Sequence, residues 1–251
     1  MYNPDGSSKI PEKDIALNLL SGFALVVNGS KITPPLSAQR VLVALALGQQ
    51  EQDRTLLGAT LYPDGRRRQV SASLRSALWR ANRAVGYAVV LNCRGQPLRL
   101  AECVRVDLHN WTRHARILTM QSRTDIASAG SELVEALSRE LLPSWGEEWL
   151  VLERQRWDQL RLHALERLVE LFAADGRHME ALEAGLAAVA IEPYRESAHR
   201  ALISAYIAEG NTASALAHYH RFNRLLAREL GVRPTAQLQA LVQHLTREAL
   251  R

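Results

Sequence analysis

The stretch Arg66–Val85, with the sequence RRRQVSASLRSALWRANRAV, decides the fold of the N-terminal half. At 100° per residue, its apolar side chains fall on a single face. This face consists of Val70, Leu74, Ala77, Leu78, Ala81 and Val85. The pattern predicts a helix from Arg67 to Val85 that packs one side on a core and leaves the other side free for a partner.

The opposite side of this helix is rich in arginine and small residues. Arg68, Arg75 and Arg83 lie there with Ala72, Ser76 and Trp79, and Arg80 and Asn82 flank them. Arginine binds guanine edges and phosphates through paired hydrogen bonds, and small neighbours let a helix enter a DNA major groove. Trp79 has two interpretations, because it can pack on a neighbouring element or contact a base. The predicted DNA contacts are Arg66, Arg67, Arg68, Ser71, Ser73, Arg75, Ser76, Trp79, Arg80, Arg83, Arg94 and Arg99.

The Arg66-Arg67-Arg68 run begins this helix and is open to two interpretations. It can be a solvated surface, or it can hold a DNA phosphate. The second interpretation has a physical basis, because a helix N-terminus adds its own positive potential to that of the side chains.

The elements around this helix predict a small α+β module. Residues 15–20 and 23–28 are predicted to form two short strands. Asn28-Gly29 is typical of a tight hairpin turn, after which residues 31–33 are predicted to form a returning strand. Ser37 is predicted to cap a helix over residues 38–47, and a second helix follows over 54–61. After the arginine-rich helix come strands over 87–92 and 98–100, and an edge strand over 104–107. This order predicts a winged helix-turn-helix over residues 15–110, after a flexible tail of residues 1–14, with Arg94 and Arg99 on the wing.

The C-terminal half repeats with a period of 34 residues. Gly176 and Gly210 are 34 positions apart, as are Leu168 and Leu202. A repeat of this length, with an aromatic residue before the glycine and small residues after it, is typical of tetratricopeptide helix pairs. Helices are also expected over residues 107–120, 125–141, 147–174 and 235–250. Residues 111–251 are therefore predicted to be an all-α, tetratricopeptide-like domain that offers a surface to another protein.

The charge of the chain is uneven. Of its 251 residues, 31 are basic and 26 acidic, and all but three of the basic ones are arginine. Residues 1–110 carry 14 basic and eight acidic groups, whereas residues 111–251 carry 17 and 18. A basic domain joined to a near-neutral one favours a protein whose first domain binds a polyanion such as a nucleic acid and whose second domain has another function. Codon bias in a GC-rich genome is the alternative explanation for the abundance of arginine.

Several motifs resemble those of the Streptomyces antibiotic regulatory protein family. They are Ser37-Ala38-Gln39-Arg40, Leu61-Tyr62-Pro63-Asp64, Ser73–Arg80, Val106-Asp107-Leu108, Leu141–Trp145, Trp149 and Leu152-Glu153-Arg154. The resemblance extends from about residue 16 to the C-terminus. It implies a winged helix followed by a bacterial transcriptional activation domain. It also implies activation of a secondary-metabolite (antibiotic) biosynthetic gene cluster from promoter direct repeats, with protomers side by side on DNA and contacts to RNA polymerase, including its sigma subunit.

Two other classes of function compete with this interpretation. The repeat domain favours a protein-interaction scaffold that does not bind DNA, and the charge asymmetry argues against it. An enzyme is disfavoured, because the sequence contains no phosphate-binding GxxxxGK[ST] loop, no HExxH and no metal-spaced Cys/His cluster. We therefore expect a cytoplasmic, nucleoid-associated protein without cofactor or metal. No apolar stretch approaches the length of a membrane span.

Overall fold

A four-stranded sheet begins the fold in the computed structural model, which describes residues 14–48, 51–86, 88–91, 97–120 and 130–248. Its strands are β1 (Ile15–Asn18), β2 (Ala24–Val27), β3 (Ser30–Ile32) and β6 (Val104–Val106), in the order β3-β2-β1-β6. Asn28 and Gly29 have φ values of 49° and 78°, as a tight hairpin turn requires. The predicted hairpin is confirmed, and β6 pairs in parallel with β1 at the sheet edge.

Three helices follow the hairpin: α1 (Leu36–Leu47), α2 (Arg54–Leu61) and α3 (Arg67–Val85). The bounds of α2 and α3 are those predicted. The expected cap of α1 is wrong, because Pro35 occupies the N-cap position and no side chain caps the helix. Ser37 lies two residues past the N-cap, and its hydroxyl accepts a hydrogen bond from Arg80 instead.

Glycine lets α2 and α3 approach each other closely. A Cβ atom at Gly58 would lie 2.8 Å from Val70 Cγ1, which is closer than real Cβ contacts. The α3 face that was predicted to be apolar is buried at Leu74, Ala77 and Leu78, and also at Ala81 and Val85. Helix α3 is therefore held on its inner side by α1 and α2.

A short two-stranded sheet comes after α3. Strands β4 (Val90–Leu91) and β5 (Arg99–Leu100) pair in antiparallel fashion, and α3 contacts β4 while α1 contacts β5. Residues 92–96, which include the predicted wing contact Arg94, lie outside the described residues.

The chain forms two units, and the first is built from two separate segments. Unit 1 comprises the residues up to Asn110 together with Leu141–Glu153. Unit 2 comprises Trp111–Glu140 and Arg154–Arg251. The predicted domain boundary at residue 110 puts residues 141–153 in the second domain. The structure places them in unit 1 because Leu141 bridges to Leu20, the Leu142 amide donates to the Leu19 carbonyl (3.0 Å), and Arg40 donates to Glu147 (2.8 Å and 2.5 Å).

Asp107 ties the start of the next helix to the sheet. Its carboxylate accepts hydrogen bonds from the Leu19 amide (2.8 Å), the Leu20 amide (3.1 Å) and the Leu108 amide (2.7 Å). One carboxylate therefore binds the Leu108 amide at the start of this helix and two amides that follow β1.

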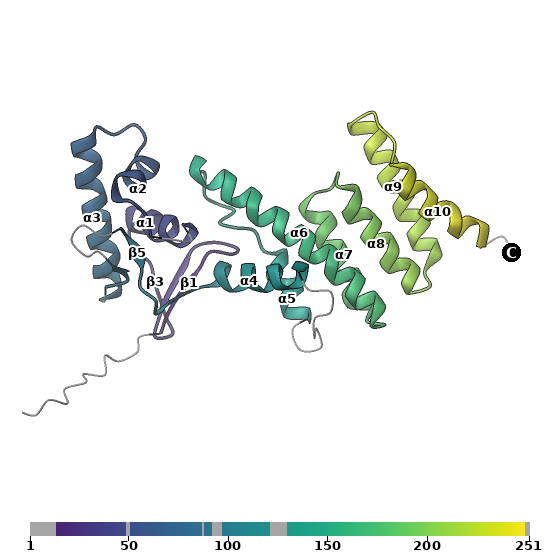
Figure 1. Cartoon of the computed structure of the whole chain (residues 1–251), viewed down its shortest axis with the longest axis horizontal. Coiled ribbons are helices and arrows are strands. Elements are labelled where there is room, and N and C mark those ends of the chain that lie inside the picture. Colours follow the sequence, from purple (N-terminus) through teal and green to yellow (C-terminus); the bar gives the residue numbers. More distant parts are fainter. Residues whose placement is uncertain (1–13, 49–50, 87, 92–96, 121–129, 249–251) are drawn as a thin grey trace, which may run out of the picture. The chain divides into compact units, whose positions relative to one another are not determined.

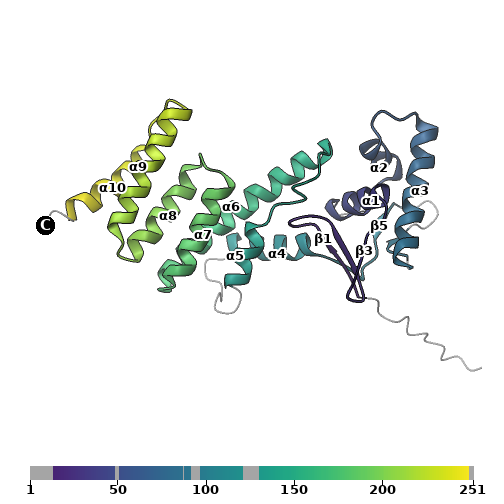
Figure 2. The ribbon, with the colours of Figure 1, turned by 180° about the vertical axis from the view of Figure 1, so that it is seen from behind.

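The rest of the described chain is mainly helical (Figures 1 and 2). They are α4 (Asp107–Met120), α5 (Gly130–Ser138), a 3-10 turn at Glu148–Leu150, α6 (Val151–Ala174), α7 (His178–Ile191), α8 (Glu196–Ala208), α9 (Thr212–Glu229) and α10 (Ala236–Glu248). The predicted helix over 125–141 is shorter among the described residues. It ends at Ser138, and Leu141 instead forms an isolated antiparallel bridge to Leu20 of unit 1. In Figure 1, α7, α8 and α9 stack in sequence order, and α10 contacts α9.

Residues that are 34 positions apart in the sequence occupy equivalent positions in successive helix pairs. Gly176 and Gly210 follow the ends of α6 and α8 with φ values of 74° and 81°, which only glycine adopts freely. Between α7 and α8, a Cβ at Gly185 would lie 3.1 Å from Leu202 Cα, so the two helices meet at a small residue. Leu168 and Leu202 are both fully buried.

Helices α5 and α6 are joined through a buried cation. Arg161 is 3% exposed, donates to the Leu137 and Ser138 carbonyls at the end of α5 (3.3 Å and 3.2 Å), and pairs with Asp158 (2.8 Å). A buried charge is tolerated when it is paired and hydrogen-bonded in this way. Among the described residues, none of the helices combines the length and apolar character needed to cross a bilayer.

Candidate nucleic-acid interface

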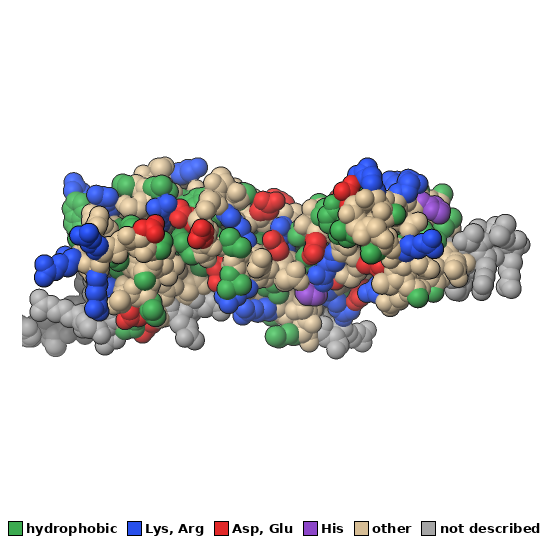
Figure 3. Space-filling view, turned by 90° about the horizontal axis from the view of Figure 1, so that it is seen from above, with side chains coloured by type: hydrophobic (Ala, Val, Ile, Leu, Met, Phe, Trp, Pro, Cys, Tyr) green, Lys and Arg blue, Asp and Glu red, His purple; other side chains and the backbone are tan. Residues whose placement is uncertain are grey.

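Helix α3 presents a polar, arginine-rich face that the rest of unit 1 leaves uncovered. Arg75 and Arg83 are exposed on this face, and Ser76 is half-buried beside them. Ser73 is also half-buried, whereas Ser71 is exposed and donates its hydroxyl proton to the Arg67 carbonyl (3.0 Å). Figure 3 shows Lys and Arg side chains along the part of unit 1 where α3 lies.

Positively charged side chains cluster at the N-terminus of α3, where the helix dipole disfavours cations. Arg66 is the N-cap residue, Arg67 and Arg68 open the first turn, and all three are exposed. The first turn contains no acidic residue. Cations near a helix N-terminus each cost about 0.3–1 kcal/mol against the helix dipole. An anion bound at this point would therefore be stabilised by the side chains and by the helix end together.

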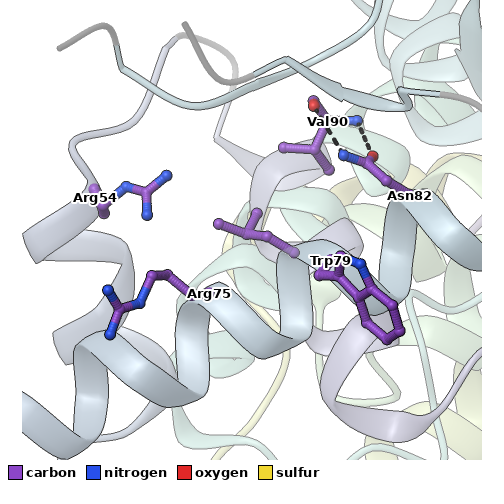
Figure 4. Close-up of a pocket in the computed structure, with 6 residues that line it drawn as sticks. Arg54, Arg75, Trp79, Asn82 and Val90 are labelled. Carbon is purple, nitrogen blue, oxygen red and sulfur yellow. Dashed lines mark hydrogen bonds between the residues drawn. The ribbon is translucent and has the colours of Figure 1, made fainter. Parts of the chain in front are cut away.

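A depression of about 180 Å³ lies between α2, α3 and β4. It is lined by Arg54, Arg75, Leu78, Trp79, Asn82 and Val90. Arg54 and Arg75 come from different helices and reach the same end of the depression, and the Trp79 indole lies at the other end (Figure 4). Within the part of the chain that the structure describes, no carboxylate pairs with Arg54 or Arg75. This end of the depression is consequently positive and suited to an anionic ligand.

Trp79 lies at the surface of α3 beside Arg83. The side chain is 57% exposed, and the Arg83 guanidinium lies 4.8 Å from the centre of its ring. A cation over an indole face is attracted to the ring, so the two side chains hold each other on the surface of α3.

Asn82 connects α3 to the two-stranded sheet. Its Oδ1 accepts from the Val90 amide (2.9 Å) and its Nδ2 donates to the Val90 carbonyl (3.4 Å). A side-chain amide that satisfies both backbone groups of one residue replaces a missing strand partner. The direction of β4 relative to α3 is set by this pair.

Two of the predicted arginines form side-chain hydrogen bonds or ion pairs within unit 1. Arg80 donates to the Ser37 hydroxyl (3.1 Å), and Arg99 pairs with Glu102 (3.3 Å) and Glu51 (3.8 Å). Beside Arg80, burial raises the pKa of the Tyr62 hydroxyl, and the charges of Arg40 and Arg80 oppose that rise. The structure therefore places Arg75 and Trp79 at the two ends of one depression, sets Arg83 over Trp79, gathers Arg66–Arg68 at the helix start, and holds Arg99 in ion pairs.

Sequence reasoning missed two residues of this region. Arg54 follows the N-cap Asp53, whose carboxylate accepts from the Thr55 and Leu56 amides (2.7 Å and 3.0 Å). These hydrogen bonds, from Leu56 first and then Thr55, hold the pKa of Asp53 below its ordinary value. The Asp53 cap signals the start of α2, but it does not mark Arg54 as a residue that lines the depression. Nothing in the sequence pointed to the contact of Asn82 with Val90, which depends on how the chain returns after α3.

Comparison with known proteins identifies the family. Residues 106–246 match the family described as bacterial transcriptional activator domain. The chain is 33% identical over 233 residues to the Regulatory protein AfsR of Streptomyces coelicolor, covering 84% of this chain and 23% of that protein. It is 27% identical over 185 residues to the Regulatory protein DnrI of Streptomyces peucetius, covering 70% of this chain and 66% of that protein. The chain thus spans about a quarter of the length of AfsR.

A solved structure shares the fold. The structure of Mycobacterium tuberculosis EmbR in complex with a low affinity phosphopeptide matches with a TM-score of 0.74 at 20% identity, covering 94% of this chain and 66% of that one. Both have a small sheet and mostly helical content. With more than half of its length matched to the activator domain and with these regulators as relatives, the chain belongs to the Streptomyces antibiotic regulatory protein family of transcriptional activators.

Proposed function

We propose that unit 1 is a winged helix-turn-helix domain that binds double-stranded DNA in a sequence-specific manner. In this proposal α3 enters the major groove, α2 lies across the backbone, and the β4–β5 hairpin acts as the wing. The observation that carries the proposal is the outer face of α3. Its exposed arginines stand beside small residues, and Arg75 has no carboxylate partner among the described residues.

The side chains of this region have different roles in the proposed complex. Arg75 lies in the middle of α3 and reads base edges, with Ser73 and Ser76 making shorter contacts beside it. Arg66, Arg67 and Arg68 hold a phosphate at the helix start, and Ser71 lies one turn further along. The remaining contacts on α3 are Trp79, Arg80 and Arg83.

Two arginines are assigned to the wing. Arg94 and Arg99 contact the backbone or the minor groove, where they position the domain without reading bases. Arg99 would exchange its ion pairs with Glu51 and Glu102 for a phosphate. Because these pairs are exposed, each contributes only about 0–1 kcal/mol, so the exchange is inexpensive.

Unit 2 is proposed to act on the transcription machinery. Its helix pairs, with glycines 34 residues apart, support a tetratricopeptide-like surface for a protein partner. We propose that this surface recruits RNA polymerase, including its sigma subunit, while protomers bind side by side on promoter direct repeats. We further propose that the protein controls a secondary-metabolite gene cluster and acts in the cytoplasm, on the nucleoid. Its membership of a family of transcriptional activators supports a regulatory role.

The proposal is tested by DNA binding of the full chain. Genomic footprinting supplies a cognate site, and fluorescence anisotropy compares it with a random duplex at several salt concentrations. With about 4–6 phosphates neutralised per protomer, the slope of log K on log salt is expected to be about −4 to −5. A slope near zero would exclude DNA binding and favour the scaffold function.

Single arginine variants separate base reading from phosphate contact. Arg75→Ala is expected to cost about 1–3 kcal/mol on the cognate site and to lower the cognate-to-random ratio about tenfold or more. Arg94→Ala is expected to leave that ratio within about threefold and to flatten the salt slope by about 1. Arg105→Ala is the matched control, because Arg105 is an exposed arginine on the edge strand β6. A larger change in the ratio for Arg94→Ala than for Arg75→Ala would show that α3 is not the reader.

A further inference from the structure

A second basic surface lies in unit 2, on helix α9. It is a groove of about 650 Å³ lined by Arg221, Arg224, Leu225, Ala227 and Arg228. The three arginines are spaced i, i+3 and i+7, so they share one side of the helix. In Figure 3, Lys and Arg side chains also gather over the part of unit 2 where α9 lies.

The charge of the α9 groove is largely uncompensated. Arg228 pairs with Glu229 (2.6 Å). Arg221 donates from Nη2 to Nδ1 of His218 (3.3 Å), which orients the guanidinium without neutralising it. In the described ranges no carboxylate pairs with Arg221 or Arg224. Among the described residues, the groove therefore presents two arginines without a carboxylate partner and a third that is paired with the exposed Glu229.

The same groove has an apolar floor. Leu225 is half-buried and packs against the core that Phe222 and Leu226 form with their neighbours, and Ala227 is exposed beside it. Directly after α9, Leu230 and Val232 are 54% and 50% exposed. Apolar surface between arginines is typical of a protein-binding groove, since aliphatic side chains have no complementary group on a DNA backbone. The near-neutral charge of residues 111–251 also argues against a nucleic acid at this place.

We propose that the α9 groove binds an acidic amphipathic helix of a protein partner. Carboxylates of that helix would lie on Arg221, Arg224 and Arg228, and its apolar stripe would cover Leu225 and Ala227. The assignment of this helix to the transcription machinery rests on the proposed function. The chemistry of the groove does not, so the two can fail separately.

The experiment measures binding of a defined probe to the full chain. The probe is a fluorescent amphipathic peptide of about four helical turns, with leucines on one face and glutamates along both flanks of that face. Anisotropy is expected to show saturable binding, weakened at least tenfold by the double variant Arg224→Ala/Arg228→Ala. A peptide with glutamine at every glutamate position is expected to lose binding as well.

Two further variants make the test specific. Ala227→Glu places a carboxylate in the groove at an exposed position and is expected to weaken binding about as much as the double variant. Arg116→Ala removes an exposed arginine from α4 and is expected to change the Kd less than twofold. Circular dichroism and melting confirm that each variant is folded.

The outcomes distinguish the possible occupants. Absence of saturable binding, or equal weakening by Arg116→Ala, would overturn the proposal. So would a double variant that loses affinity for a random DNA duplex but not for the peptide, because the groove would then hold nucleic acid. If the chain binds the peptide but no DNA, the proposed function fails and the groove assignment stands. If it binds DNA but not the peptide, the groove assignment fails and the proposed function stands.

Discussion

Acid is expected to destabilise unit 2 through two buried histidines. His199 Nδ1 lies 2.9 Å from His218 Nε2, and His199 Nε2 lies 2.8 Å from the Pro193 carbonyl oxygen. Because a carbonyl oxygen can only accept a hydrogen bond, His199 Nε2 carries the proton of this ring. His199 Nδ1 is then unprotonated and accepts a hydrogen bond from His218 Nε2. His218 Nδ1 in turn accepts from Arg221. Each ring is therefore neutral with one proton, and a second proton on either ring would face another donor.

The magnitude follows from the pKa of His218. Burial, followed by the charges of His199 and Arg221, lowers this pKa from 6.5 to about 4. Burial also lowers the pKa of His199, against the opposing effects of the Pro193 carbonyl and Glu196. The shift of about 2.5 pH units at His218 would correspond to about 3 kcal/mol, and solvent screening reduces this to about 2 kcal/mol.

The sign is set by the number of bound protons. The unfolded chain protonates His218 near pH 6.5, whereas the folded chain resists protonation of this ring until about pH 4. The unfolded state therefore binds more protons in this window, and the free energy of unfolding decreases as the pH falls through it. Above about pH 6.5 the contribution is fully present.

Urea unfolding of the full chain, followed by far-ultraviolet circular dichroism at about pH 7 and about pH 4.5, measures this loss. His218→Gln is expected to lower stability at neutral pH and to reduce the loss between the two pH values. His220→Gln is the matched control, because His220 is exposed on the same helix. The reasoning is refuted if His218→Gln and the wild type lose the same stability on acidification.

Three other predictions concern packing and positioning. Leu202→Ala is expected to lower the free energy of unfolding by about 2–5 kcal/mol in urea titrations, because the side chain is fully buried; Leu186→Ala, at a 52% exposed position, should cost little, and equal costs would contradict the repeat packing. Gly58→Ala is expected to cost about 1–3 kcal/mol through its contact with Val70; if Val70→Ala does not relieve this cost in the double variant, the clash is not its cause. Asn82→Ala is expected to speed hydrogen exchange of the Val90 amide and to cost about 1–3 kcal/mol, since that amide loses its partner; unchanged exchange would refute the role of Asn82.

Periodic segments of the chain could be predicted from the sequence, and tertiary contacts could not. The apolar stripe from Leu74 to Val85 and the Asn28-Gly29 turn are local signals, and the structure confirms α3 and the hairpin. The error at Ser37 has a physical reason. A serine before an apolar run is a good cap, but Pro35 already fixes the backbone where the helix begins, and Arg80 from another helix binds the hydroxyl.

The candidate site was predicted in part for the same reason. The face of α3 follows from its sequence, so Arg75 and Trp79 were identified. Arg54 and Asn82 complete the depression only because α2 and β4 fold against α3. Such a meeting of segments has no periodic signal in a single sequence.

The return of residues 141–153 to unit 1 has a consequence for cutting and grafting this protein. A fragment that ends at Asn110 lacks the Leu141 bridge, the Leu142 hydrogen bond and the Glu147 carboxylate that Arg40 binds. A contiguous fragment that keeps them must also carry residues 111–140, which belong to unit 2. The matched family segment, 106–246, likewise includes this piece of unit 1. A graft that moves unit 1 between relatives must therefore transfer two segments, residues up to 110 and residues 141–153. A single crossover between them would combine the first segment of one parent with the second segment of the other.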